Sequence, residues 1–128
     1  MEDLEDKDNI SIGKLGEDLA CEYLANKGHR ILQRNYRKPW GEIDIVARAK
    51  DNTLVFVEVK ALVGGEKIGL TPEDNLTAAK LMKLRRTCAA FVAKNPDLVN
   101  EKRGWRIDLV AITLNSETKP EIRHYENI

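Results

Sequence analysis

Apolar residues recur at three- and four-residue steps in two segments of this chain, the spacing of a helix with one buried face. The first segment follows Ser11, a residue type favoured at helix N-caps, and ends before Gly28, which suits the left-handed position after a helix. The second covers residues 75–94 and stops at Asn95-Pro96. The stripe predicted for the first helix comprises Ile12, Leu15, Gly16, Leu19, Ala20, Tyr23 and Leu24.

Shorter runs between and after these helices predict β-strands. Their ranges are 30–37, 42–48, 53–61 and 105–114, with a short edge strand at 121–125. The run 105–114 is nearly all apolar after Asp108, which indicates a central or well-covered strand. Segment 62–70 contains several glycines and is expected to be a mobile loop. The order α-β-β-β-α-β predicts one sheet flanked by helices.

Length and charge limit the range of functions. The 128 residues predict one domain at 11–128, preceded by a disordered acidic segment at 1–10. Equal numbers of basic and acidic residues, 21 each, give a net charge of zero. This argues against a protein that coats nucleic acid by bulk charge, so any phosphate-binding surface must be local.

Cysteine usage and the start of the chain indicate a cytoplasmic protein. Cys21 and Cys88 lie far apart in helical patterns, so they suggest neither a disulfide framework nor a zinc site. The acidic start lacks the apolar stretch of a signal peptide, and no run approaches membrane-spanning length. We therefore expect no membrane partner.

Asp44, Glu58 and Lys60 place charges inside strands that otherwise appear buried, which is costly unless the charges are compensated. A three-residue turn at 50–52 would set Asp44 opposite Glu58 and Glu42 opposite Lys60, all on one face. A shift of one residue would separate Asp44 from Glu58. Paired carboxylates suit Mg²⁺ or Mn²⁺, and a lysine beside them could orient water or neutralise phosphate charge. A buried ion-pair network is the equally weighted alternative.

Several sequence blocks together resemble the YraN family of the PD-(D/E)XK nuclease superfamily, which is grouped with Holliday-junction-resolvase-like endonucleases. The similarity extends from about Ile12 to the end of the chain. The blocks are Gly16-Glu17-Asp18-Leu19-Ala20, Arg34-Asn35-Tyr36-Arg37, Gly41-Glu42-Ile43-Asp44, Phe56-Val57-Glu58-Val59-Lys60 and Arg106-Ile107-Asp108-Leu109-Val110. The resemblance implies a restriction-endonuclease-like α/β fold with a mixed central sheet.

The same resemblance implies roles for individual residues. Asp44 and Glu58 would be metal ligands, Lys60 the catalytic lysine, and Glu17 an acidic helix residue directed at the metal. Gly13 and Gly16 beside Glu17 are expected to allow close packing, although Glu17 could equally be a solvated acid near a helix N-terminus. One departure is Ala61-Leu62, where the family usually has a polar residue and then an arginine.

Basic residues outside this motif are candidates for DNA contacts. Lys80 could reach a phosphate at the metal site, and Lys83, Arg86 and Arg37 could contact the backbone, although exposed charge is the commoner explanation. Trp40 could stack on a base, but half-buried packing is the more frequent role. Asp108 could orient Arg106 or a lysine at the site, or it could equally cap the strand entrance. His29 and His124 are assigned to no site.

The resemblance, together with the carboxylate pattern, implies a Mg²⁺- or Mn²⁺-dependent DNA endonuclease that would act on branched or damaged DNA. Resolvase-like enzymes are typically dimers, so a homodimer is expected by analogy. The alternative is a catalytically weak or inactive nuclease fold that binds DNA or protein. A third interpretation is an adaptor whose strand charges form a closed salt-bridge network.

Overall fold

The computed structural model describes residues 4–64, 71–115 and 117–128. The described residues form two long helices, five strands and two short 3₁₀ helices, η1 and η2. The elements are α1 (Leu4–Asn26), β1 (Arg30–Lys38), β2 (Gly41–Arg48), β3 (Leu54–Val63), η1 (Pro72–Asn75), α2 (Ala78–Lys94), η2 (Pro96–Leu98), β4 (Trp105–Leu114) and β5 (Glu121–Tyr125). No helix within these described ranges is long and apolar enough to cross a membrane.

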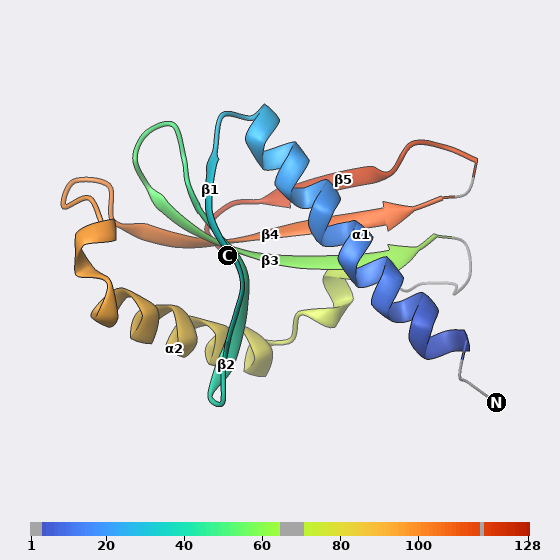
Figure 1. The fold of residues 1–128 in the computed structure, drawn as a ribbon, viewed down its shortest axis with the longest axis horizontal. Helices are drawn as coiled ribbons and strands as arrows, with labels where there is room; N and C mark the ends of the chain where they lie inside the picture. The colour runs from blue at the N-terminus through green and yellow to red at the C-terminus, as the bar shows by residue number, and fades with distance from the viewer. Residues whose placement is uncertain (1–3, 65–70, 116) are drawn as a thin grey trace.

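The five strands form one mixed sheet in the order β1-β2-β3-β4-β5. Only β3 and β4 are parallel, and α2 lies in the long connection between them. The other neighbours are antiparallel. The two helices lie on different sides of this sheet (Figure 1), which is the restriction-endonuclease-like arrangement predicted.

Each face of the sheet has its own hydrophobic core, because strand side chains alternate between the two faces. Beneath α1, Ala20 and Leu24 pack on residues of β2, β3 and β4 such as Val55 and Val110. On the opposite face, Leu84, Cys88 and Phe91 of α2 pack on Tyr36, Ile43, Val46, Leu54, Phe56 and Ile107. Cys88 is buried and Cys21 is partly buried, and both are free thiols.

Helix boundaries differ more from the prediction than strand boundaries do. The α1 helix begins at Leu4, so residues 4–10 are helical where disorder was expected. No glycine or proline separates Leu4 from Ser11, and acidic residues are favourable in a first helical turn. The α2 helix begins later than predicted, at Ala78, because the Thr77 side chain caps it by accepting from the Lys80 N–H at 3.2 Å.

Two further expectations need revision. Segment 62–70 was predicted to be a loop, but Leu62 and Val63 belong to β3, and 65–70 lie outside the described residues. Leu15 was placed in the buried stripe of α1, yet 48% of its surface is exposed. The buried line instead follows Gly16, Ala20 and Leu24 at four-residue steps.

Gly16 explains why the buried line shifts away from Leu15. A Cβ atom at Gly16 would lie 2.6 Å from the Cβ of Ala61, so α1 and β3 touch where the glycine has no side chain. Gly13, predicted to pack closely too, has no atom within 4 Å of such a Cβ. The contact of Gly16 with Ala61 therefore sets how closely α1 packs against the sheet.

We predict opposite effects for alanine at these two glycines. Gly16→Ala overpacks the contact with Ala61 and should lower the free energy of unfolding by about 1–3 kcal/mol. Gly13→Ala is the matched control and should raise it by about 0.5–1 kcal/mol through helix propensity. Urea denaturation measures both, and adding Ala61→Gly should rescue Gly16→Ala. Equal effects at the two glycines would contradict the close contact.

Candidate active site

The hairpin of β2 and β3 has the predicted register. Its turn closes with the Ala49 N–H donating to the Thr53 carbonyl at 2.9 Å, and Ile45 lies opposite Val57 at the other end of the ladder. Asp44 and Glu58 occupy the next position of this register, where the paired ladder has ended. The two carboxylates therefore stand at the point where the strands separate.

The backbone around Asp44 departs from regular strand geometry on both sides. Toward β3, the Asp44 Oδ2 accepts the Val59 N–H at 2.8 Å, so a side chain replaces a backbone carbonyl as the acceptor. Toward β1, Asn35 has a φ of 54° between the pairs that precede and follow Asp44. Asparagine tolerates this left-handed conformation better than most residues. Such local irregularity is concentrated at functional sites.

A cavity of about 270 Å³ lies on the α2 side of Asp44. Glu42, Asp44 and Glu58 line it from the strands, and Lys80 and Lys83 line it from α2. The Lys60 Nζ lies 3.2 Å from the Glu58 Oε1. The structure thus brings together the predicted carboxylate pair, its lysine and two of the four predicted basic contacts.

The close approach of α2 to the sheet shapes this cavity. A Cβ atom at Gly41 would collide with the Thr87 side chain, so glycine is needed where β2 starts. Thr87 also lines the cavity and donates its hydroxyl to the Lys83 carbonyl at 3.0 Å. This packing brings the first two turns of α2, with their lysines, over the carboxylates.

A second cavity, of about 680 Å³, reaches Asp44 from the α1 side. Glu17 and Arg37 line it, so both are near Asp44 but not on the face that carries Glu58. The Glu17 Oε1 is buried, accepts no hydrogen bond, and lies 3.5 Å from the Arg34 Nε. Among the residues that the structure describes, no three His, Cys, Asp or Glu side chains form a ready metal-ligand cluster. Glu17 approaches Asp44 without completing a three-carboxylate cage.

Burial dominates the electrostatics of the carboxylate pair. It raises the pKa of Asp44 to about 7, helped by repulsion from Glu58 and opposed by the Val59 N–H. Burial also raises the pKa of Glu58, and the Lys60 ammonium partly offsets that shift. At neutral pH the pair therefore holds a proton or attracts a cation.

Arg86 and Trp40 lie outside both cavities. Arg86 lines a separate groove with Met82 and Trp105 on the other flank of α2. Trp40, with 47% of its surface exposed, lies at the turn between β1 and β2, and the Lys94 Nζ is 4.9 Å from its ring centre. Neither residue touches the carboxylate pair.

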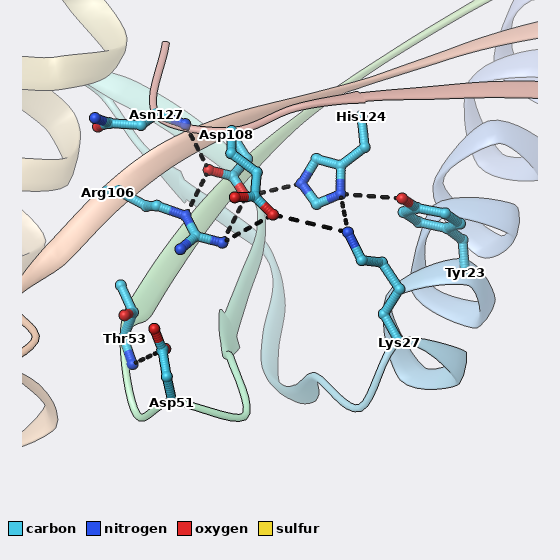
Figure 2. Close-up of polar contacts among 9 residues, drawn as sticks. Tyr23, Lys27, Asp51, Thr53, Arg106, Asp108, His124 and Asn127 are labelled. Carbon is cyan, nitrogen blue, oxygen red and sulfur yellow. Dashed lines mark hydrogen bonds and ion pairs between the residues drawn. The ribbon is translucent and has the colours of Figure 1, made fainter.

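Asp108 belongs to a buried structural network, shown in Figure 2. It accepts hydrogen bonds from the Arg106 Nε at 2.9 Å, from the His124 Nε2 at 2.8 Å and from the Asn127 backbone N–H at 3.0 Å. Burial alone would raise the pKa of Asp108, but these donors outweigh it and hold that pKa below its usual value.

His124 links this network to α1. The Lys27 ammonium can only donate and lies 3.1 Å from the His124 Nδ1, so this nitrogen is an acceptor and also accepts from the Tyr23 hydroxyl at 3.1 Å (Figure 2). Orienting Arg106 was one of the two roles considered for Asp108, and the structure supports it. His124 was assigned to no site from the sequence. Together with Asp108 it connects the end of α1 to β4 and β5.

Sequence reasoning assigned no site role to three residues that lie beside Asp44 or Glu17. Asn35 lines the second cavity in its left-handed conformation, Arg34 faces Glu17, and Asp18 holds Arg34 through a 2.7 Å hydrogen bond. An asparagine within a strand pattern was the available signal for Asn35. The contacts of Arg34 depend on how α1 lies against β1, which no local pattern encodes.

Comparison with known proteins identifies the family. The profile described as "Uncharacterised protein family UPF0102" matches residues 16–112. The chain belongs to this family. UPF0102 is the YraN-like family of the PD-(D/E)XK nuclease superfamily, so the resemblance noted in the sequence is confirmed. The matched range contains Glu17, Asp44, Glu58 and Lys60.

Individual UPF0102 proteins align with nearly the whole chain. The one from Alkaliphilus oremlandii is 42% identical over 119 residues, covering 93% of this chain and 97% of the relative. One from Mycobacterium ulcerans is 37% identical over 119 residues, with 90% and 91% coverage. One from Mycobacterium bovis is 35% identical over 135 residues, with 100% and 99% coverage.

We predict that Asp44→Asn stabilises the protein at alkaline pH without divalent cations. The raised pKa of Asp44 means that the folded state binds more protons than the unfolded state between about pH 4 and pH 7. Wild-type stability should therefore fall as pH rises through this window. At pH 8 in EDTA, Asp44→Asn should be more stable by on the order of 2 kcal/mol.

Urea denaturation from pH 4 to pH 8 measures this effect. The exposed Asp97, in η2, provides a matched control, and Asp97→Asn should follow the wild-type pH dependence. An Asp44→Asn curve that runs parallel to wild type would show that Asp44 titrates normally.

Proposed function

We propose that this protein is a metal-dependent DNA endonuclease that hydrolyses phosphodiester bonds. The observation that carries the proposal is the buried pair of Asp44 and Glu58, whose pKa values are both raised at the floor of a cavity lined by lysines. Perturbed carboxylates that share a cavity are more typical of chemistry than of structural support.

The donor set fits a hard divalent cation. Carboxylate oxygens are the ligands that Mg²⁺ and Mn²⁺ prefer, and Asp44 and Glu58 supply them from adjacent strands. Glu17 offers a buried oxygen without a hydrogen-bond donor on the α1 side of Asp44, and it would become a third ligand only by moving toward the Asp44–Glu58 pair. Once bound, such a cation would supply Lewis acidity toward the phosphate and lower the pKa of a water molecule.

Lysine side chains of the chain would position the DNA phosphates and the attacking water, and would neutralise negative charge on the phosphate. The ammonium of Lys60, held 3.2 Å from Glu58, can orient water beside the phosphate or neutralise charge that develops on it. Lys80 and Lys83 face the same cavity and would bind the flanking phosphates. Arg37 would contact DNA from the second cavity.

Three further features belong to the proposal. The neutral net charge favours recognition of DNA structure, such as branched or damaged DNA, over tight nonspecific coating. We also propose a homodimer, by analogy with resolvase-like enzymes that cut two strands. The site of action would be the cytoplasm.

A catalytically weak or inactive binding module is the second candidate, and internal charge pairing favours it. Lys60 pairs with Glu58, and Arg34 lies 3.5 Å from Glu17, so part of the site's charge is already compensated. Ala61, which stands where the family usually has a polar residue, packs against Gly16 and offers no phosphate contact. The two candidates differ in whether bonds are cut.

Cleavage of linear, flap and four-way DNA in Mg²⁺ or Mn²⁺ tests the proposal. Wild type should cut at least one substrate, and Asp44→Asn and Lys60→Met should each reduce the rate by about 100-fold or more. Glu22→Gln, on the exposed side of α1, is the control and should retain wild-type activity. Equal activity in all four proteins would indicate a contaminating nuclease. No cutting by wild type would favour the binding module.

A further inference from the structure

The two helices that flank the sheet carry opposite charges. The α2 helix has five basic side chains and no acidic one, whereas the part of α1 from residue 11 to residue 26 has three acidic side chains and one basic side chain. In a chain of zero net charge, this difference concentrates positive charge on the α2 side. A polyanion is therefore expected to approach from that side.

Lys80, Lys83 and Arg86 form a row across α2, which we call the basic row. Residues three apart on a helix are surface neighbours, and all three side chains are exposed. The first two line the cavity that contains Asp44 and Glu58, and Arg86 lines the groove on the opposite flank of the helix. The basic row thus connects the candidate active site with that groove.

Among the residues that the structure describes, the basic row has no carboxylate partner. Within the described ranges, no carboxylate lies at ion-pairing distance from any of its three side chains, and Lys80 instead donates to the Asn75 carbonyl at 3.0 Å. Other cations of the chain are neutralised: Arg34 by Asp18, Arg106 by Asp108 and Arg123 by Glu73. As far as the described residues go, the charge on the basic row is therefore available to a ligand.

The groove at the end of the basic row combines aromatic, thioether and cationic groups. It has a volume of about 420 Å³ and lies between α2 and the start of β4. Trp105 is 36% exposed and Met82 56% exposed, and the Arg86 Nη2 lies 3.6 Å from the Met82 sulfur. An edge-to-face contact with Phe56, at 5.5 Å between ring centres, fixes the Trp105 ring.

A fixed, accessible indole beside an arginine is a stacking platform for an unpaired base. The bases of an intact duplex are stacked on one another, so their faces are not available to Trp105. The combination of basic row and groove therefore fits single-stranded DNA better than duplex DNA.

We propose that the basic row guides an unpaired DNA strand from the Asp44–Glu58 cavity to the groove, where a base stacks on Trp105. The inference rests on the proposed function in that the strand at the cavity is the nuclease substrate. It specifies that substrate as DNA with a single-stranded segment adjoining the cleavage site.

Fluorescence of Trp105 provides a direct test. The chain has two tryptophans, so Trp40→Phe leaves Trp105 as the only reporter. In EDTA, where cleavage cannot interfere, a 15-nucleotide oligo(dT) should quench this fluorescence with a salt-dependent affinity. In the same background, Lys83→Gln and Arg86→Gln should each weaken binding several-fold and reduce the slope of log K against log salt by about 0.7.

Lys94→Gln is the matched control, because it removes the same charge from the same helix outside the basic row. It should leave both affinity and slope unchanged. The proposal is overturned if oligo(dT) does not quench Trp105, or if Lys94→Gln weakens binding as much as Lys83→Gln. Equal quenching by a blunt duplex or by poly-glutamate would overturn it too. Quenching in EDTA without cleavage of any substrate in Mg²⁺ would overturn the endonuclease proposal and leave this one standing.

Discussion

Burial of the Asp44 carboxylate where β2 separates from β3 is the constraint on which the site depends. Removing an ionised carboxylate from water is costly unless donors or cations compensate it. The Val59 N–H donates one hydrogen bond to the Asp44 carboxylate, but the neighbouring Glu58 carboxylate repels that of Asp44. The protein therefore keeps two acids in a position that destabilises their charged forms, and a divalent cation would relieve that strain.

The rest of the fold holds this arrangement in place. Direct contact of Gly16 with Ala61 brings α1 down onto β3, and contact of Gly41 with Thr87 brings α2 onto the start of β2. Asp108 and His124 join β4, β5 and the end of α1 (Figure 2). Each face of the sheet is thus covered by a helix in close contact with it, and β2 and β3 are held in place where they separate. This preorganises the carboxylates before a ligand arrives.

Local patterns predicted the strands and the position of the carboxylates. The three-residue turn and the two-residue alternation of side chains were enough to set Asp44 beside Glu58. The same reasoning could not predict the Val59 N–H bond or the left-handed Asn35, because a strand pattern assumes that the ladder continues. It also misplaced Leu15, since Gly16 lets the helix approach along a different line. The partners of Asp108 and Arg34 come from other strands and helices, so no local pattern contains them.

Titration of the Asp44 carboxyl carbon by ¹³C NMR, with and without Mg²⁺, would show whether this carboxylate is destabilised by burial and relieved by a cation. We expect a pKa of about 7 for Asp44 in the free protein. We also expect a clear fall in that pKa when Mg²⁺ is added, because a bound cation favours the ionised form. A pKa near the ordinary value of about 3.9 in the free protein, unchanged by Mg²⁺, would contradict this account of the site.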